Sequence, residues 1–135
     1  MSLIRFIFLF SLTIVCFSKL GQCDSAPLTF SITSLLVEKG KTASILLSET
    51  ATYRRIVKNG KGVKTEHLYR VCNGKNKTTC GYWQNVKTKK KVASGATSYN
   101  KKKRVLVVKK FRATDAGTYM TGNKNETMEV SVYSN

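Results

Sequence analysis

The chain has 135 residues, of which 24 are Lys or Arg and 7 are Asp or Glu, so its formal net charge at pH 7 is +17. Its one histidine, His67, gives no support to a histidine-based metal centre or a Ser-His-Asp arrangement, and the scattered acidic residues offer no close carboxylate pair for glycosidase chemistry. The sequence also has no glycine-rich phosphate loop, so we interpret the protein as a non-enzyme without a cofactor or metal.

The first 23 residues are typical of a secretory signal peptide. Arg5 supplies the basic start, residues 6–17 form a short apolar core, and small residues precede Cys23. The apolar run is shorter than the about 20 residues of a membrane-spanning helix. We predict cleavage after Ser18 or Cys23, a domain over residues 24–135, and a secreted, extracellular protein with no transmembrane anchor.

Secretion determines how the cysteines are interpreted. Cys16 lies inside the signal peptide and Cys23 at its edge, which leaves Cys72 and Cys80 for a disulfide in an oxidising compartment. Half of a zinc site is the alternative, but His67 is the one histidine nearby and no further cysteine pair follows. The disulfide would close a polar loop and contribute about 2 to 3 kcal/mol. Cleavage after Ser18 would leave Cys23 unpaired for an intermolecular link.

Two sequence motifs predict N-glycosylation of an extracellular protein. They are Asn76-Lys77-Thr78 and Asn125-Glu126-Thr127, both in polar segments that we interpret as loops. We therefore predict Asn76 and Asn125 as glycan acceptors.

Alternating apolar residues predict a series of short strands after Pro27. A strand over 28–32 continues along the sheet edge at 35–37, and later strands cover 40–47, 53–58, 66–72, 80–87, 98–108 (two strands) and 128–132. Asn59-Gly60 predicts a tight turn. We interpret Trp83 as part of a strand face partly covered by the disulfide hairpin, with a binding hot spot as the alternative.

Residues 106–119 carry the most specific pattern. Leu106 and Val108 alternate on one face, Phe111 continues it, and Asp115 and Gly117 suit a tight turn before Tyr119. This run resembles the corner between strands E and F of the immunoglobulin superfamily. The resemblance implies that the Tyr119 ring lies in the core and its hydroxyl bonds to upstream backbone. We expect Asp115 to cap the turn or to pair with a basic residue such as Arg104.

The resemblance covers most of residues 28–133 and implies an all-β, immunoglobulin-like antiparallel β-sandwich. The two family cysteine positions fall on Leu47 and Thr121, so we expect the usual inter-sheet disulfide to be absent and these side chains to face each other. The predicted core consists of Leu47, Leu106, Val108, Phe111, Tyr119, Val130 and Val132.

Basic residues gather in runs. Without Arg5 and Lys19, which lie in the signal peptide, 22 basic residues face 7 acidic ones, a net charge of +15. Such a surplus attracts polyanions. We predict polyanion binding at two runs, which would merge into one patch if they are neighbours: Lys87, Lys89, Lys90 and Lys91, and Lys101, Lys102, Lys103 and Arg104. The alternative is a solvated surface that only keeps the domain soluble.

Together these features predict a small secreted immunoglobulin-like binding module that recognises a cell-surface or extracellular protein or an anionic glycan, without enzymatic activity and without specific nucleic-acid binding. The alternative is a cationic host-defence protein acting on anionic membranes, although the mature chain lacks a strong amphipathic helix. A third possibility is a homodimer formed through an exposed sheet.

Overall fold

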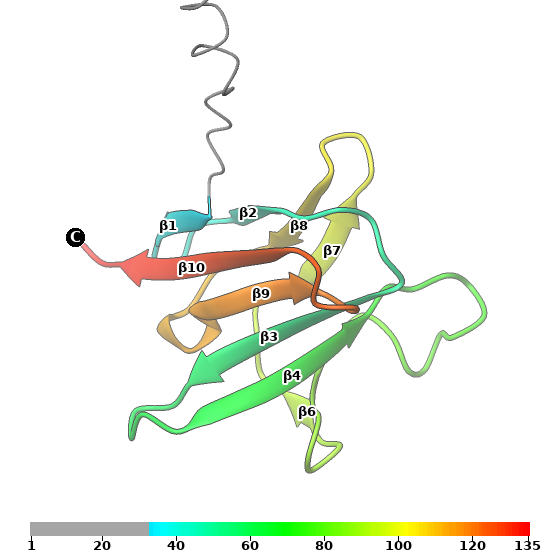
Figure 1. Ribbon diagram of the computed structural model, residues 1–135, viewed down its shortest axis with the longest axis horizontal. Coiled ribbons are helices and arrows are strands. Elements are labelled where there is room, and N and C mark those ends of the chain that lie inside the picture. The colour runs from blue at the N-terminus through cyan, green and yellow to red at the C-terminus, as the bar shows by residue number, and fades with distance from the viewer. Residues whose placement is uncertain (1–32) are drawn as a thin grey trace, which may run out of the picture. The chain divides into compact units, whose positions relative to one another are not determined.

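Ten strands and one short 3-10 helix make up residues 33–135, the part of the chain that the computed structural model describes (Figure 1). The predicted signal peptide over 1–23 and the predicted strand over 28–32 lie outside the described residues. The elements are β1 (Ser34–Glu38), β2 (Ala43–Leu46), β3 (Thr52–Lys58), β4 (Lys64–Arg70), β5 (Trp83–Asn85), β6 (Lys91–Val92), β7 (Thr97–Asn100), β8 (Val105–Val108), η1 (Ala113–Asp115), β9 (Gly117–Thr121) and β10 (Thr127–Tyr133).

The strands form two sheets. The larger has the order β1-β10-β9-β3-β4-β5-β6 and the smaller has the order β2-β8-β7. All neighbours are antiparallel except β1, which runs parallel to β10. This division of strands is that of a variable-type immunoglobulin sandwich, in which two extra strands extend one sheet. The protein therefore has the predicted immunoglobulin-like β-sandwich fold, with one parallel edge pair.

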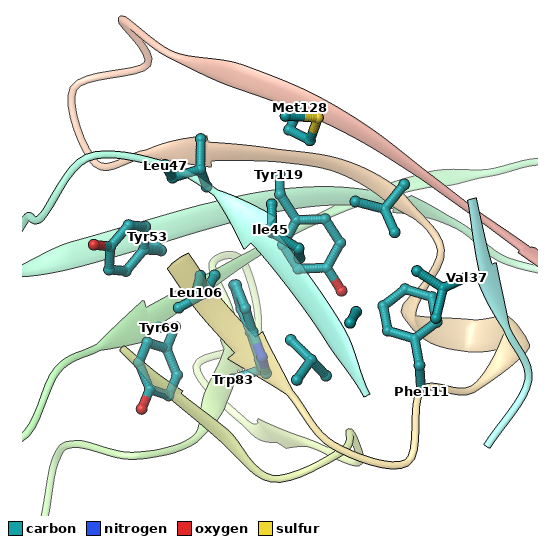
Figure 2. Close-up of a cluster of buried hydrophobic side chains, with 13 residues drawn as sticks. Val37, Ile45, Leu47, Tyr53, Tyr69, Trp83, Leu106, Phe111, Tyr119 and Met128 are labelled. Carbon is teal, nitrogen blue, oxygen red and sulfur yellow. The ribbon is translucent and has the colours of Figure 1, made fainter. Parts of the chain in front are cut away.

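The core lies between the two sheets because each strand turns alternate side chains inward (Figure 2). Of the predicted core residues, six are buried and Val132 is half-buried against them; the six are Leu47, Leu106, Val108, Phe111, Tyr119 and Val130. The core also contains three further aromatic side chains, Tyr53, Tyr69 and Trp83, and the smaller side chains of Val37, Ala43, Ile45 and Met128.

Trp83 is a core residue, so the binding hot-spot interpretation is wrong. The pairing of Trp83 with Tyr69 on β4 points both rings inward, 5.4 Å apart, and only 1% of Trp83 is exposed. Its indole N–H donates to the Thr97 hydroxyl at 2.9 Å, which satisfies the one polar group of the ring.

Leu47 and Thr121 come from opposite sheets, and both are buried. Leu47 directly follows β2, Thr121 ends β9, and the Thr121 hydroxyl bonds to Asn123 Oδ1 at 2.7 Å, so its burial leaves no polar group unsatisfied. The predicted disulfide between Cys72 and Cys80 is present in the connection from β4 to β5, where it joins Cα atoms 5.0 Å apart.

Candidate functional site

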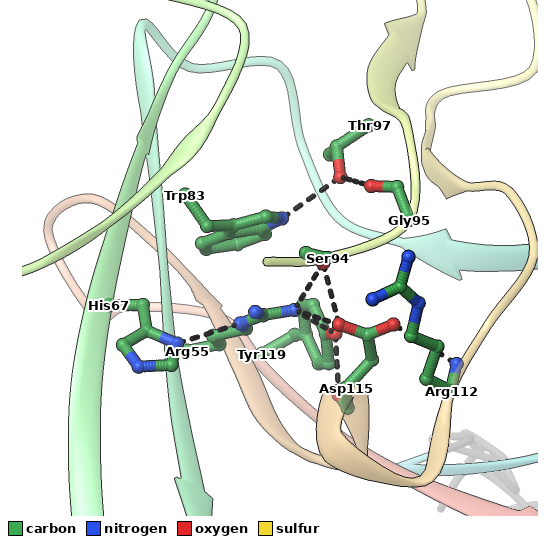
Figure 3. Close-up of polar contacts among 9 residues, drawn as sticks. All are labelled: Arg55, His67, Trp83, Ser94, Gly95, Thr97, Arg112, Asp115 and Tyr119. Atoms are coloured by element: carbon green, nitrogen blue, oxygen red, sulfur yellow. Dashed lines mark hydrogen bonds and ion pairs between the residues drawn. The ribbon is translucent and has the colours of Figure 1, made fainter. Parts of the chain in front are cut away.

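A buried charge lies at the centre of the sandwich. Arg55 is on β3 between the outward-facing Arg54 and Ile56, so the strand turns its guanidinium into the core, where the side chain is fully buried. Arg55 Nη1 donates to Asp115 Oδ1 at 2.9 Å, and the Asp115 side chain is also fully buried (Figure 3). Because water is excluded from both groups, each charge depends on the other.

Neighbouring side chains hold this ion pair in place. Arg55 Nη1 also lies 3.0 Å from the Ser94 and Tyr119 hydroxyl oxygens, and Nε donates to His67 Nδ1 at 3.2 Å. The guanidinium carbon lies 4.3 Å from the centre of the Trp83 ring, a cation–π contact. The buried charge cluster, which we define as Arg55, His67, Ser94, Asp115 and Tyr119, thus connects four segments of the chain (Figure 3).

The corner motif supplies the acidic side of this cluster. The Tyr119 hydroxyl donates to the Asp115 carbonyl oxygen at 2.6 Å, and Asp115 Oδ2 accepts the backbone N–H of Arg112 at 3.0 Å. A Cβ atom at Gly117 would collide with the Ile56 carbonyl oxygen, so close approach of two strands requires glycine there.

The charge partner of Asp115 differs from the one expected. Asp115 pairs with Arg55, whereas Arg104 is exposed in the connection between β7 and β8. The expected pairing of Asp115 with Arg104 is wrong, because Arg104 precedes the first residue of β8 and Asp115 lies in η1, after the last one. The strand that contacts η1 is β3, which carries Arg55.

Burial shifts the pKa values of two members of the cluster. It lowers the pKa of His67 to about 4, and the nearby Arg55 charge acts in the same direction. Burial also raises the pKa of Tyr119 to about 12. His67 therefore stays neutral at physiological pH and accepts a hydrogen bond from Arg55. The ionisable members of the cluster are buried and support the core, whereas Ser94 is half-buried.

Acidification is expected to destabilise the domain through His67. Between the ordinary histidine pKa of about 6.5 and the folded value of about 4, the unfolded chain binds a proton that the folded chain does not, so stability falls as pH falls. The expected loss between pH 7 and 5 is about 2 kcal/mol, measured by urea unfolding. His67→Gln keeps an acceptor for Arg55 and should flatten this dependence. An equal loss in both proteins would contradict the assignment.

A second candidate site is the outer face of the larger sheet. It carries three apolar residues on adjacent strands, Ile56, Leu68 and Met120, and Arg54 lies between Leu68 and Met120 in the register. Met120 is 4% exposed, whereas Ile56 and Leu68 are half-buried. Glu66 pairs with Arg54 at 2.8 Å and with Lys124 at 3.7 Å, and Arg70 bonds to Gln84 at 2.8 Å. The Arg54 hydrogen bond holds the pKa of Glu66 below its usual range. We call these eight residues the outer face.

The remaining predicted site residues lie in connections. Asn76 is in the disulfide loop, where its Nδ2 donates to the Val71 carbonyl oxygen at 3.0 Å, and Asn125 is exposed in the turn between β9 and β10. Glycan occupancy stays a prediction.

The two predicted basic runs do not form one patch. Lys87, Lys89, Lys90 and Lys91 lie in and just after the connection between β5 and β6. The run over 101–104 forms the connection between β7 and β8, at the opposite end of the view in Figure 1. Their separation follows from the topology, because β6 pairs in the larger sheet and β7 in the smaller one.

Within residues 33–135, no three His, Cys, Asp or Glu side chains gather closely enough to hold a metal ion. The same part of the chain contains no helix of the length and hydrophobicity needed to cross a membrane.

Comparisons with known proteins do not assign the chain to a family. No family model matches it, and no curated protein matches it. Among solved structures, the chain is similar to the extracellular domain of the voltage-gated sodium channel beta4 subunit, whose parallel homodimers are described as explaining its role in cell-cell adhesion. The identity is 11%, the match covers 80% of this chain and 91% of that chain, and the TM-score is 0.45.

Proposed function

We propose that the protein is an extracellular, non-enzymatic binding module that recognises a protein partner through the outer face of its larger sheet. The observation that carries this proposal is the combination of half-buried apolar side chains, Ile56 and Leu68, with charged side chains that ion pairs hold in place on the same strands. Protein interfaces likewise combine apolar and polar contacts.

The charged side chains of the outer face are held in place before any partner binds. Arg54 donates to Glu66 at 2.8 Å through Nη1 and to the Gly122 carbonyl oxygen at 3.1 Å through Nε, so both ends of its guanidinium are fixed. A side chain that is already ordered loses less conformational entropy on association. The outer face therefore offers a rigid platform on strands rather than on loops.

The buried position of the unusual ionisable groups supports a binding role over a catalytic one. His67 is 5% exposed and Asp115 is fully buried, so neither reaches a bound substrate. The predicted signal peptide, the predicted glycan acceptors and the disulfide support an extracellular location. A second copy of the chain is the simplest partner to test, because a two-fold pairing of outer faces needs no other protein.

Leu68→Glu tests the proposal, because it places a charge at an apolar position of the outer face. A fluorescent, streptavidin-linked form of the secreted protein should bind cells, and the variant should bind at least about tenfold more weakly. Leu46→Glu is the matched control: Leu46 is 59% exposed on the outer side of the smaller sheet, and its replacement should leave binding unchanged. Equal binding by wild type and Leu68→Glu, with equal melting temperatures, would refute the proposal.

The nature of the partner is tested separately. Binding to cells should disappear after protease treatment of the cells and survive removal of surface glycans. Sedimentation velocity at increasing concentration distinguishes a second copy from another protein. If the partner is a second copy, the wild type forms dimers and Leu68→Glu abolishes them.

A further inference from the structure

Two basic segments that are distant in sequence lie side by side. Residues 39–41 connect β1 to β2, and residues 109–112 follow β8. The Gly40 N–H donates to the Phe111 carbonyl oxygen, and the Phe111 N–H donates to the Lys41 carbonyl oxygen, both at 2.8 Å. Because Phe111 is fully buried, this pairing anchors the two segments to the core while their lysine and arginine side chains stay exposed.

A groove continues from this junction. The Lys109 N–H donates to the Ala96 carbonyl oxygen at 2.9 Å, which brings the segment 93–96 alongside. The groove has a volume of about 330 Å³, and both Lys91 and Arg112 line it. Its floor includes four consecutive small residues, at 93–96, of which Ala93 and Ala96 are exposed and Gly95 is buried against the Lys109 carbonyl oxygen. Figure 3 shows Arg112 beside Ser94 and Gly95.

The charge of this surface is not compensated locally. We define the basic ridge as Lys39, Lys41, Lys91, Lys109, Lys110 and Arg112, all of which are exposed. None of the six takes part in the four ion pairs of residues 33–135. Asp115, the one buried carboxylate of residues 33–135, is already neutralised by Arg55. Six unpaired cations on one surface create a strong positive potential that attracts an extended anion.

We propose that the basic ridge binds a sulfated glycan chain. Its six cations come from three segments, and two of them, Lys91 and Arg112, line the groove, so the ridge suits a linear polyanion rather than a single ion. Five of the six are lysines, which act as point charges toward sulfate groups. Base stacking needs free aromatic faces, and the Lys91 ammonium already lies 5.5 Å from the centre of the Tyr82 ring in the groove.

This ridge differs from the polyanion site that the sequence predicts. Of the eight residues in the two predicted runs, Lys91 alone belongs to the ridge. In the other run, Lys101 pairs with Glu49 at 3.3 Å, which reduces its charge toward a ligand. The ridge also shares no residue with the outer face. A negative result for glycan binding therefore leaves the proposed protein recognition untouched, and the reverse also holds.

Heparin affinity of the secreted protein tests this inference. The ridge variant carries Lys41→Gln, Lys109→Gln, Lys110→Gln and Arg112→Gln. The control variant loses the same four charges through Lys101→Gln, Lys102→Gln, Lys103→Gln and Arg104→Gln. Wild type and control should elute from heparin above physiological salt and the ridge variant below it. The Kd for a heparin fragment should rise at least about tenfold in the ridge variant, with a shallower salt dependence because fewer counterions are released.

Several outcomes would overturn the inference. Equal losses in the two variants would mean that net charge alone governs binding. Tighter binding to single-stranded DNA than to heparin of equal charge would assign the ridge to nucleic acid, and dye leakage from anionic vesicles would assign it to membranes. If the ridge variant fails to fold, acetylation of the wild type decides instead: heparin should protect Lys41, Lys109 and Lys110 and leave Lys102 reactive, and uniform protection would refute the ridge.

Discussion

Asp115→Asn is expected to lower the free energy of unfolding by about 3 to 5 kcal/mol, because it leaves the Arg55 guanidinium charged and unpaired in the core. The substitution is almost isosteric, and the amide oxygen at the Oδ1 position can still accept the hydrogen bond from Ser94. The amide nitrogen at the Oδ2 position can no longer accept the backbone N–H of Arg112. The loss therefore reports the missing charge and one hydrogen bond, and not a lost shape. Urea unfolding at pH 7 measures it.

Two further variants separate the charge from the hydrogen bonds. Ser94→Ala removes one 2.6 Å hydrogen bond to Asp115 and should cost about 1 kcal/mol. Adding Arg55→Met to Asp115→Asn removes the unpaired cation and should recover part of the stability. A stability for Asp115→Asn equal to that of wild type, or no recovery in the double variant, would show that the pair is not coupled.

Tyr119→Ala should cost about 3 to 5 kcal/mol, as large aromatic deletions in a core do. The fully buried ring packs against Trp83 at 5.6 Å and Phe111 at 6.4 Å between ring centres, and its hydroxyl joins the buried charge cluster. Truncation would leave a cavity and remove one partner of Arg55. Differential scanning calorimetry of the variant measures the effect.

Tyr119→Phe is the matched control for this prediction. It keeps the ring and removes the hydroxyl that donates to the Asp115 carbonyl oxygen, so it should cost about 1 to 3 kcal/mol. An unchanged melting temperature for Tyr119→Ala would rule out the corner role of this residue.

Local patterns were sufficient to predict the smaller sheet and the corner. Leu106, Val108 and Phe111 are buried as predicted because their spacing alone places them on one face of a strand that ends in a turn. The strands over 53–58 and 128–132 were found for the same reason, and their observed bounds differ by one residue at each end or less.

Contacts between distant segments could not be predicted in the same way. Arg54 and Arg55 are adjacent and chemically identical, and only the register of β3 decides that one reaches the outer face and the other the core. The signal in the sequence for an inward-facing Arg55 was its position between Tyr53 and Val57, which alternate with it along the strand. The basic ridge depends on two backbone hydrogen bonds between residues 40–41 and Phe111, which no local pattern encodes.

The single histidine has a consequence for the behaviour of the protein in acidified compartments. Because His67 is held neutral inside the sandwich, the one histidine of the chain adds no positive charge to the surface of the folded domain down to about pH 5. Mild acid therefore weakens the scaffold through His67 without creating a further surface cation. An anion bound at the proposed basic ridge would remain attached in mild acid, and its release would require unfolding, proteolysis or competing salt.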